Sequence, residues 1–142
     1  MCIRDSNKEP MKFRDLEKIV HPATRQYQIV YIEKLISDGS PGCILDIPLL
    51  FETGGEKYID VSVVVTASEE KQKERVVSER KVPLEIFNSI KNQQMPDREK
   101  LKKADYIIST DQTLDETKLE VKDVVSRIKL INPKAWNAFY KK

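Results

Sequence analysis

The sequence has 142 residues, enough for one domain with a single core, and its 39% hydrophobic and 34% charged residues are typical of a globular protein. The formal net charge of +2 excludes the strongly basic character of many nucleic-acid-binding domains. Because no apolar stretch approaches the length that spans a bilayer and the N-terminus lacks the apolar core of a signal peptide, we expect a cytoplasmic protein with neither a nucleic-acid nor a membrane partner.

The N-terminal part of the chain is predicted to be helical. Residues 1–6 share no pattern with the rest of the chain, and we interpret residues 1–11 as a disordered or artefactual N-terminus. Apolar residues at helical spacing predict a helix over residues 12–20. Pro22 then predicts a break and a second helix, because proline is tolerated in a first helical turn, and Gly39 is the expected C-terminal cap. His21 lies at this break, where a histidine serves either as a structural cap or as a catalytic base.

Three short segments are predicted to be strands. Residues 43–50 form a nearly continuous apolar run, which is typical of a strand buried on both faces of a parallel sheet. Residues 61–66 and 106–109 are rich in β-branched and aromatic side chains. Cys43 is expected to be a small buried hydrophobe. Neither a disulfide nor a metal site is expected from Cys43 and Cys2.

Helical segments are predicted between and after these strands. The residues Thr66-Ala67-Ser68-Glu69 and Thr113-Leu114-Asp115-Glu116 both match a capping box, which predicts helices over about residues 68–80 and after Thr113. Strands that alternate with helices predict a parallel α/β sheet. Residues 81–103 interrupt this alternation with a polar helical stretch that has too few apolar residues for a core. This stretch is either a lid over a cleft or a long surface crossover.

Ligands of open α/β sheets bind at the carboxyl ends of the strands, which here are residues 46–52, 66–68 and 109–112. Asp46 is costly in an apolar strand, so it either faces a metal or a substrate hydroxyl in a cleft or caps a neighbouring helix. Arg75 and Arg80 lie on one predicted helix. Their guanidinium groups either bind phosphate or pair with surface carboxylates such as those of Glu70, Glu74 and Glu79.

Several catalytic motifs are absent from these 142 residues. There is no G-x-x-x-x-G-K-[ST] and no G-x-G-x-x-G, and the four glycines form no phosphate cradle after a strand. The patterns H-E-x-x-H, G-x-S-x-G and C-x-x-C are also absent, so no metal site is predicted. Motifs alone therefore indicate only a soluble α/β domain.

Four segments, taken in order, resemble the dephospho-CoA kinase family. Residues 16–25 (LEKIVHPATR) look like the family's I-x-H-P-x-x-R segment, and residues 46–52 (DIPLLFE) are similar to its block D-[IV]-P-L-L-[FY]-E. Residues 72–80 followed by 94–96 resemble its lid, and residues 103–108 (KADYII) resemble its last core strand, K-A-D-x-[VI]-I. The resemblance extends over roughly residues 12–130 and argues against another kinase with a similar lid, such as a nucleoside monophosphate kinase.

The resemblance implies a three-layer α/β fold of the P-loop kinase type, with a parallel sheet and a helical lid insertion. The family's first strand and P-loop precede the matched region and have no counterpart in the sequence. The implied parts are a helical substrate-binding region (residues 12–40), an α/β core (41–75), a lid-like helical insertion (76–103), the last strand and helix of the core (104–131) and a C-terminal tail without an assigned role (132–142).

The resemblance also implies an activity, the phosphorylation of the ribose 3′-hydroxyl of dephospho-CoA by ATP and Mg²⁺ in the last step of coenzyme A biosynthesis. It assigns dephospho-CoA binding to one set of residues, His21, Arg25, Asp46, Pro48 and Leu49. It assigns the nucleotide and the lid to a second set, Arg75, Arg80, Thr110 and Asp111. No catalytic residue is assigned, and without a P-loop the chain is expected to be inactive by itself. The alternative is a non-catalytic α/β module that binds CoA or a nucleotide or docks on a partner.

Overall fold

The computed structural model describes residues 10–140, which form two compact units that divide between Leu45 and Asp46. The first unit consists mainly of α2 (Pro10–Ser37), a single helix that contains Pro22 in its interior. The predicted break at Pro22 is therefore wrong, and His21 is an exposed residue within a helix rather than a cap. An interior proline costs a helix about 3 kcal/mol, which the remaining hydrogen bonds of so long a helix outweigh. Gly39 ends the helix with a φ of 71°, as predicted.

A two-stranded parallel sheet lies in the second unit. β1 (Val63–Thr66) pairs with β2 (Tyr106–Ser109), with Val63 opposite Tyr106 and Thr66 opposite Ser109. Both strands occur where β-branched side chains predict them, although β1 begins at Val63 and not at Val61. The predicted parallel α/β sheet is confirmed.

The predicted strand over residues 43–50 is not formed. Residues 42–47 have no regular structure, residues 48–54 form turns, and β1 and β2 are the strands of the sheet in the described residues. A strand needs a neighbouring strand to satisfy its N–H and C=O groups, and this segment has none there. Cys43 is exposed, so its predicted burial is also wrong. Cys2 and the rest of residues 1–9 lie outside the described residues.

Helices occupy most of the remaining second unit. A turn of 3₁₀-helix, η1 (Gly55–Tyr58), precedes β1. Between the strands lie α3 (Glu69–Lys73), the π-helix η2 (Glu74–Glu79), α4 (Leu84–Gln93) and α5 (Asp97–Lys103), and after β2 come α6 (Leu114–Ile128) and the π-helix η3 (Trp136–Tyr140). The capping box at Thr113 is present as predicted. The box at Thr66 is not, because Ser68 is the N-cap of α3 and accepts the Lys71 N–H.

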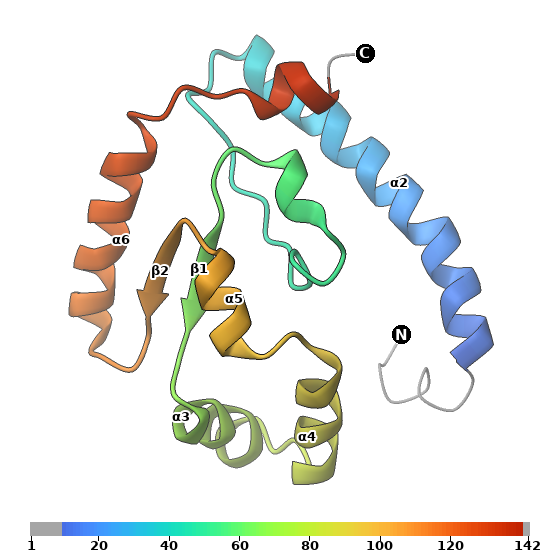
Figure 1. Ribbon diagram of the computed structural model, residues 1–142, viewed down its shortest axis with the longest axis vertical. Helices are drawn as coiled ribbons and strands as arrows, with labels where there is room; N and C mark the ends of the chain where they lie inside the picture. Colours follow the sequence, from blue (N-terminus) through green and yellow to red (C-terminus); the bar gives the residue numbers. More distant parts are fainter. Residues whose placement is uncertain (1–9, 141–142) are drawn as a thin grey trace. The chain divides into compact units, whose positions relative to one another are not determined.

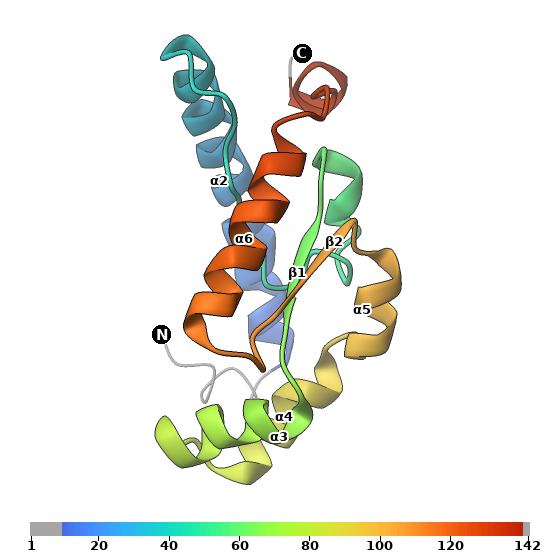
Figure 2. The same ribbon diagram turned by 90° about the vertical axis from the view of Figure 1, so that its left-hand side faces the viewer.

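The helices surround the sheet on two sides and at one end. Figure 2 shows α6 on one side of the two strands and α5 on the other. Both strands point toward α3, so α3, η2 and α4 gather beyond their carboxyl ends (Figure 1). Ile108 of β2 and Val124 of α6 are buried, as is Phe87 of α4. The stretch over residues 81–103, expected to have too few apolar residues for a core, therefore still buries one aromatic ring.

Within the second unit, the C-terminal segment is held by Asp60. The Oδ1 atom of Asp60 accepts hydrogen bonds from the N–H groups of Lys134 at 2.5 Å and Ala135 at 2.8 Å. Ala135 is buried, and the rings of Trp136 and Tyr140 stack with their centroids 5.7 Å apart. The carboxylate thus satisfies backbone donors that precede η3.

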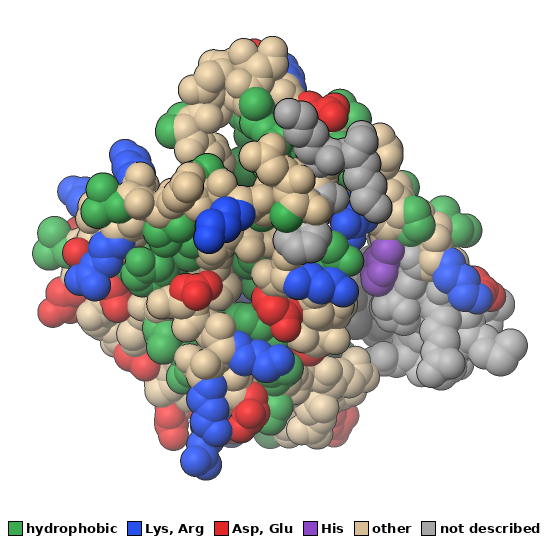
Figure 3. Space-filling view, turned by 45° about the horizontal axis from the view of Figure 1, so that its top comes forward, with side chains coloured by type: hydrophobic (Ala, Val, Ile, Leu, Met, Phe, Trp, Pro, Cys, Tyr) green, Lys and Arg blue, Asp and Glu red, His purple; other side chains and the backbone are tan. Residues whose placement is uncertain are grey.

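Acidic and basic side chains are interspersed on the face of the molecule drawn in Figure 3, in line with the small net charge. Within residues 10–140, no helix combines the length and the apolar character that a bilayer crossing requires.

Candidate functional site

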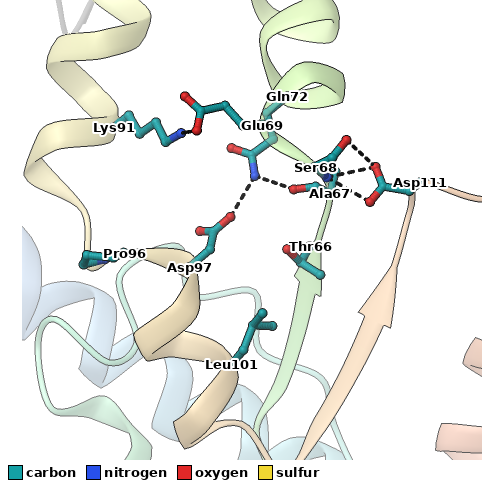
Figure 4. Close-up of a pocket in the computed structure, with 10 residues that line it drawn as sticks. All are labelled: Thr66, Ala67, Ser68, Glu69, Gln72, Lys91, Pro96, Asp97, Leu101 and Asp111. Carbon is teal, nitrogen blue, oxygen red and sulfur yellow. Dashed lines mark hydrogen bonds and ion pairs between the residues drawn. The ribbon is translucent and has the colours of Figure 1, made fainter.

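A pocket of about 570 Å³ opens at the carboxyl ends of the two strands, beside α3 and the start of α5. Figure 4 shows Leu101 pointing from α5 toward Thr66 at the end of β1, with polar side chains around them. The volume falls within the range of small-molecule sites. The lining residues are Thr66, Ala67, Ser68, Glu69, Gln72, Lys91, Pro96, Asp97, Leu101 and Asp111.

Ser68 and Asp111 join the turns that come after β1 and β2. The Ser68 N–H lies 2.8 and 2.9 Å from the two carboxylate oxygens of Asp111, and its hydroxyl donates to Oδ1 at 2.9 Å. The Ser68 N–H and hydroxyl, together with the nearby positive charges of Arg75 and Lys71, hold the pKa of Asp111 below its ordinary value. Asp111 is thus ionised at neutral pH and fixes the edge of the pocket.

Arg75 is held just beyond the end of β2 by Thr110, and neither residue is among those that line the pocket. Its Nη1 donates to the Thr110 hydroxyl at 2.8 Å and its Nη2 to the Thr110 carbonyl at 2.6 Å. The Thr110 hydroxyl in turn donates to the Thr66 carbonyl at 3.0 Å. Arg75 therefore binds the end of β2 rather than a surface glutamate. Because a guanidinium group has five N–H donors, donors remain for a ligand.

Gln72 closes the other side of the pocket. Its Nε2 donates to the Ala67 carbonyl and to Asp97 Oδ2, both at 2.8 Å, and so links α3 to β1 and to α5 (Figure 4). Lys91 of α4 forms an ion pair with Glu69 of α3 at 2.8 Å. The Lys91 ammonium lowers the pKa of Glu69. The segment over residues 81–103 thus supplies one wall of the pocket.

Glu52 was given no role by the sequence, yet it makes two contacts behind this wall. Its Oε1 accepts the Met95 N–H at 2.8 Å and lies 3.1 Å from Lys100 Nζ. Burial by itself would raise the pKa of Glu52, but the Met95 N–H, its own N–H and Lys100 outweigh burial and lower the pKa. The signal available in the sequence was its place at the end of the DIPLLFE block.

The predicted site residues are distributed over both units. His21 and Arg25 lie on α2 in the first unit, where His21 is exposed. Asp46, Pro48 and Leu49 are exposed at the start of the second unit. The N-caps of α3 and α6 are Ser68 and Thr113, so Asp46 caps neither helix.

The nucleotide set is only partly brought together. Thr110, Asp111 and Arg75 meet at the strand ends, where the ligand rule for parallel sheets predicts a site. Arg80 is exposed one residue beyond η2, and its N–H donates to the Arg75 carbonyl at 3.2 Å. Among the described residues, no group of three His, Cys, Asp or Glu side chains is placed to hold a metal ion.

Comparison with known proteins identifies the family. A family profile described as dephospho-CoA kinase matches residues 6–116. The chain belongs to the dephospho-CoA kinase family. The resemblance found in the four sequence segments is therefore confirmed. The pocket at the strand ends belongs to a member of this family.

Individual relatives agree with this assignment. The chain is 40% identical over 117 residues to a dephospho-CoA kinase from Rhodopseudomonas palustris (strain CGA009). These aligned residues make up 82% of the chain and 59% of that protein. It is 38% identical over 122 residues to a dephospho-CoA kinase from Rhizobium etli, covering 86% of the chain and 60% of that protein. The chain thus spans about 60% of the length of these relatives.

A solved structure agrees with the fold. The crystal structure of TT1252 from Thermus thermophilus matches with a TM-score of 0.72 and 29% identity, covering 91% of the chain and 65% of that structure. The predicted α/β fold of the P-loop kinase type is confirmed.

Proposed function

We propose that this chain serves the ATP-dependent phosphorylation of the ribose 3′-hydroxyl of dephospho-CoA, in a cytoplasmic enzyme of coenzyme A biosynthesis. The observation that carries the proposal is the position of the pocket. In a chain of this family, a pocket of about 570 Å³ lies where the carboxyl ends of β1 and β2 meet the helical segment 81–103. Parallel sheets bind their ligands at that edge.

Arg75 and Thr110 are proposed to contribute to nucleotide binding. Two hydrogen bonds hold the Arg75 guanidinium beside the end of β2 and leave it further donors for phosphate oxygens. Arginine side chains held in advance stabilise the charge of a phosphoryl group in transfer, because they need no reorganisation during the reaction. Asp111 is proposed to act through Ser68, since its carboxylate is engaged there.

Arg80 is proposed to reach the phosphates from the segment just after η2. Arg80 is the C-cap of η2 and is exposed, which suits a residue that meets a ligand only when a lid closes. The guanidinium fork suits phosphate oxygens.

A role in dephospho-CoA binding is proposed for Asp46, Pro48 and Leu49 of the second unit. The same role is proposed separately for His21 and Arg25, which lie on α2 of the first unit. Asp46 is exposed beside a turn that Thr53 stabilises, with the Thr53 N–H and hydroxyl both donating to the Leu49 carbonyl at 3.1 and 2.8 Å. An exposed carboxylate next to an ordered turn is suited to accept a hydrogen bond from a substrate hydroxyl.

Mg²⁺ enters this proposal as part of the substrate MgATP. Mg²⁺ is commonly bound through one or two carboxylates, substrate phosphates and water rather than by a cage of protein ligands. The described residues offer no cluster of three acidic or histidine ligands, so no step is assigned to the metal.

The test joins this chain to the N-terminal segment of the Rhodopseudomonas palustris relative that precedes the matched region. A fusion is needed because the 142 residues contain no G-x-x-x-x-G-K-[ST] motif. We expect the fusion to convert dephospho-CoA to CoA with ATP, and the chain alone to show no turnover. A folded fusion without turnover, under conditions in which the intact relative is active, contradicts the proposal and favours a binding module.

Two variants of the fusion test the residue assignments. Asp46→Asn removes the charge at nearly constant shape, and we expect turnover to fall by about tenfold or more if the carboxylate contacts the reacting hydroxyl. Asp123→Asn is the matched control, because Asp123 lies on the exposed side of α6 in an ion pair with Arg127. Full activity of Asp46→Asn removes Asp46 from the site.

A further inference from the structure

Glu52 fixes the start of α5 from behind the pocket wall. It accepts the Met95 N–H at 2.8 Å and pairs with Lys100 at 3.1 Å, and the side chains of Glu52 and Lys100 are only 17% and 14% exposed. An ion pair removed from water gains little net stability, but the loss of one partner leaves an uncompensated buried charge and is strongly destabilising. The carboxylate therefore contacts both the connection between α4 and α5 and the helix α5 itself.

This contact leads directly into the pocket. Pro96, which comes directly after Met95, is the N-cap of α5, and Asp97 is its first residue. Both residues line the pocket, and Asp97 accepts a hydrogen bond from Gln72. A continuous series of contacts thus runs from Glu52 through the start of α5 to the end of β1, where Gln72 also binds the Ala67 carbonyl.

Lys103 of α5 makes a second pair of contacts, with Phe51 and with Glu56. Lys103 Nζ lies 3.9 Å from Glu56 Oε1 and 5.8 Å from the centroid of the Phe51 ring. Lys100 and Lys103 are three residues apart and share a face of α5. The turn that begins at Pro48 is therefore attached to α5 at two successive points.

We infer that Glu52 is a positioning residue, which holds Pro96 and Asp97 in the pocket wall through the Met95 backbone and does not itself touch the ligand. The turn proposed to meet dephospho-CoA and the wall of the pocket then move as one body. The inference rests on the proposed function only for the identity of the ligand. The link from Glu52 to Gln72 is independent of it.

NMR spectroscopy of the ¹⁵N-labelled 142-residue chain tests this link. Glu52→Ala removes the acceptor, and we expect hydrogen exchange at the Met95 amide to accelerate about tenfold or more, as loss of one hydrogen bond to a charged group implies. The side-chain amide signals of Gln72 should shift as well. Glu99→Ala is the matched control on α5, because its pair with Lys102 is exposed, and it should change neither signal.

A compensated variant separates positioning from stability. Lys100→Met leaves Glu52 buried without its partner, whereas Glu52→Gln combined with Lys100→Met keeps an acceptor for Met95 and removes both charges. We expect the double variant to restore slow exchange at Met95 and the Gln72 signals of the parent chain. If the exchange rate at Met95 depends only on the melting temperature of each variant, and not on whether residue 52 offers an acceptor, the inference is overturned. The single Lys100→Met variant and the double variant allow this comparison even if Glu52→Ala fails to fold.

The same variants in the active fusion connect the link to function. Glu52→Ala should raise KM about fivefold or more with a smaller change in kcat, because a displaced wall weakens binding before it alters chemistry. The double variant should recover KM. A parent fusion without turnover contradicts the proposed function and leaves the NMR result to decide the positioning role. An active fusion whose KM does not respond to Glu52→Ala overturns that role.

Discussion

Ser62 and Asp105 bind each other through three hydrogen bonds at the amino ends of β1 and β2. The Ser62 N–H and hydroxyl donate to Asp105 Oδ2 at 2.8 and 2.7 Å, and the Asp105 N–H donates to the Ser62 hydroxyl oxygen at 3.1 Å. Ser68 and Asp111 make the corresponding contact at the carboxyl ends. A serine and an aspartate thus hold the register of the sheet at each end.

Replacing Asp105 with Ala should lower the free energy of unfolding by about 1–3 kcal/mol, because it leaves the donors of Ser62 without an acceptor in a site where Ser62 is only 4% exposed. Urea denaturation followed by circular dichroism measures the change. Asp123→Ala, which breaks the exposed pair with Arg127, should change it by less than about 1 kcal/mol. Equal effects of the two substitutions would show that Asp105 does not stabilise the sheet.

Thr113 begins α6 with reciprocal hydrogen bonds to Glu116. The Glu116 N–H donates to the Thr113 hydroxyl at 3.3 Å, and the Thr113 N–H donates to Glu116 Oε2 at 2.9 Å. Thr113→Ala should cost about 1 kcal/mol of stability, whereas Thr113→Ser should retain most of it. Thr117→Ala is the control, since the Thr117 hydroxyl bonds the Thr113 carbonyl, which already accepts the Thr117 N–H. If the alanine and serine variants at position 113 unfold at the same temperature, the Thr113 hydroxyl does not stabilise the start of α6.

Lys81 adopts a left-handed backbone conformation with a φ of 57° between η2 and α4. A residue with a Cβ pays roughly 1–2 kcal/mol there, and glycine avoids that cost at the expense of some unfolded-state entropy. Lys81→Gly should therefore raise the free energy of unfolding by up to about 1 kcal/mol. Lys73→Gly, at a φ of −62°, should lower it by a similar amount. A loss of stability at both positions contradicts the assigned conformation of Lys81.

Glu52 should make the stability of the folded chain depend on pH in acid solution. Its pKa in the folded protein lies below the ordinary value of 4.5, so the unfolded chain takes up the proton first as pH falls. The contribution of Glu52 to stability is complete above pH 4.5 and is lost as pH falls through the lowered pKa. Denaturation of the parent and of the Glu52→Gln and Lys100→Met double variant at several pH values measures this. Identical pH profiles would show that Glu52 has no such linkage.

Local signals in the sequence predict the parts of the fold that local interactions determine. β1 and β2 are expected from β-branched runs, and the start of α6 is expected from Thr113 and Glu116, which are three residues apart. The failures have different causes. The strand expected at residues 43–50 depends on a neighbouring strand, and the continuity of α2 through Pro22 depends on a balance of energies along the whole helix.

The site is predictable only to the level of its location. The ligand rule for parallel sheets indicates the ends of β1 and β2, where Thr110 and Asp111 indeed meet Arg75. The partners themselves are far apart in the sequence, 43 residues for Ser68 and Asp111 and 35 for Arg75 and Thr110. Glu52 and Met95 are also separated by 43 residues, so no local pattern connects them.

The most direct test of the account is to observe which residues respond when substrates bind. The fusion protein, labelled with ¹⁵N in the 142-residue part, is titrated with ATP and with dephospho-CoA. ATP should shift the amide signals of residues 66–72, of Met95 and Asp97 and of residues 109–111. Dephospho-CoA should shift those of Asp46, Ile47, Leu49 and Leu50 and of the non-proline residues of α2. If the signals of all three of these ATP-responsive segments stay unchanged in a fusion that nevertheless produces CoA, the nucleotide binds elsewhere and the pocket is not its site.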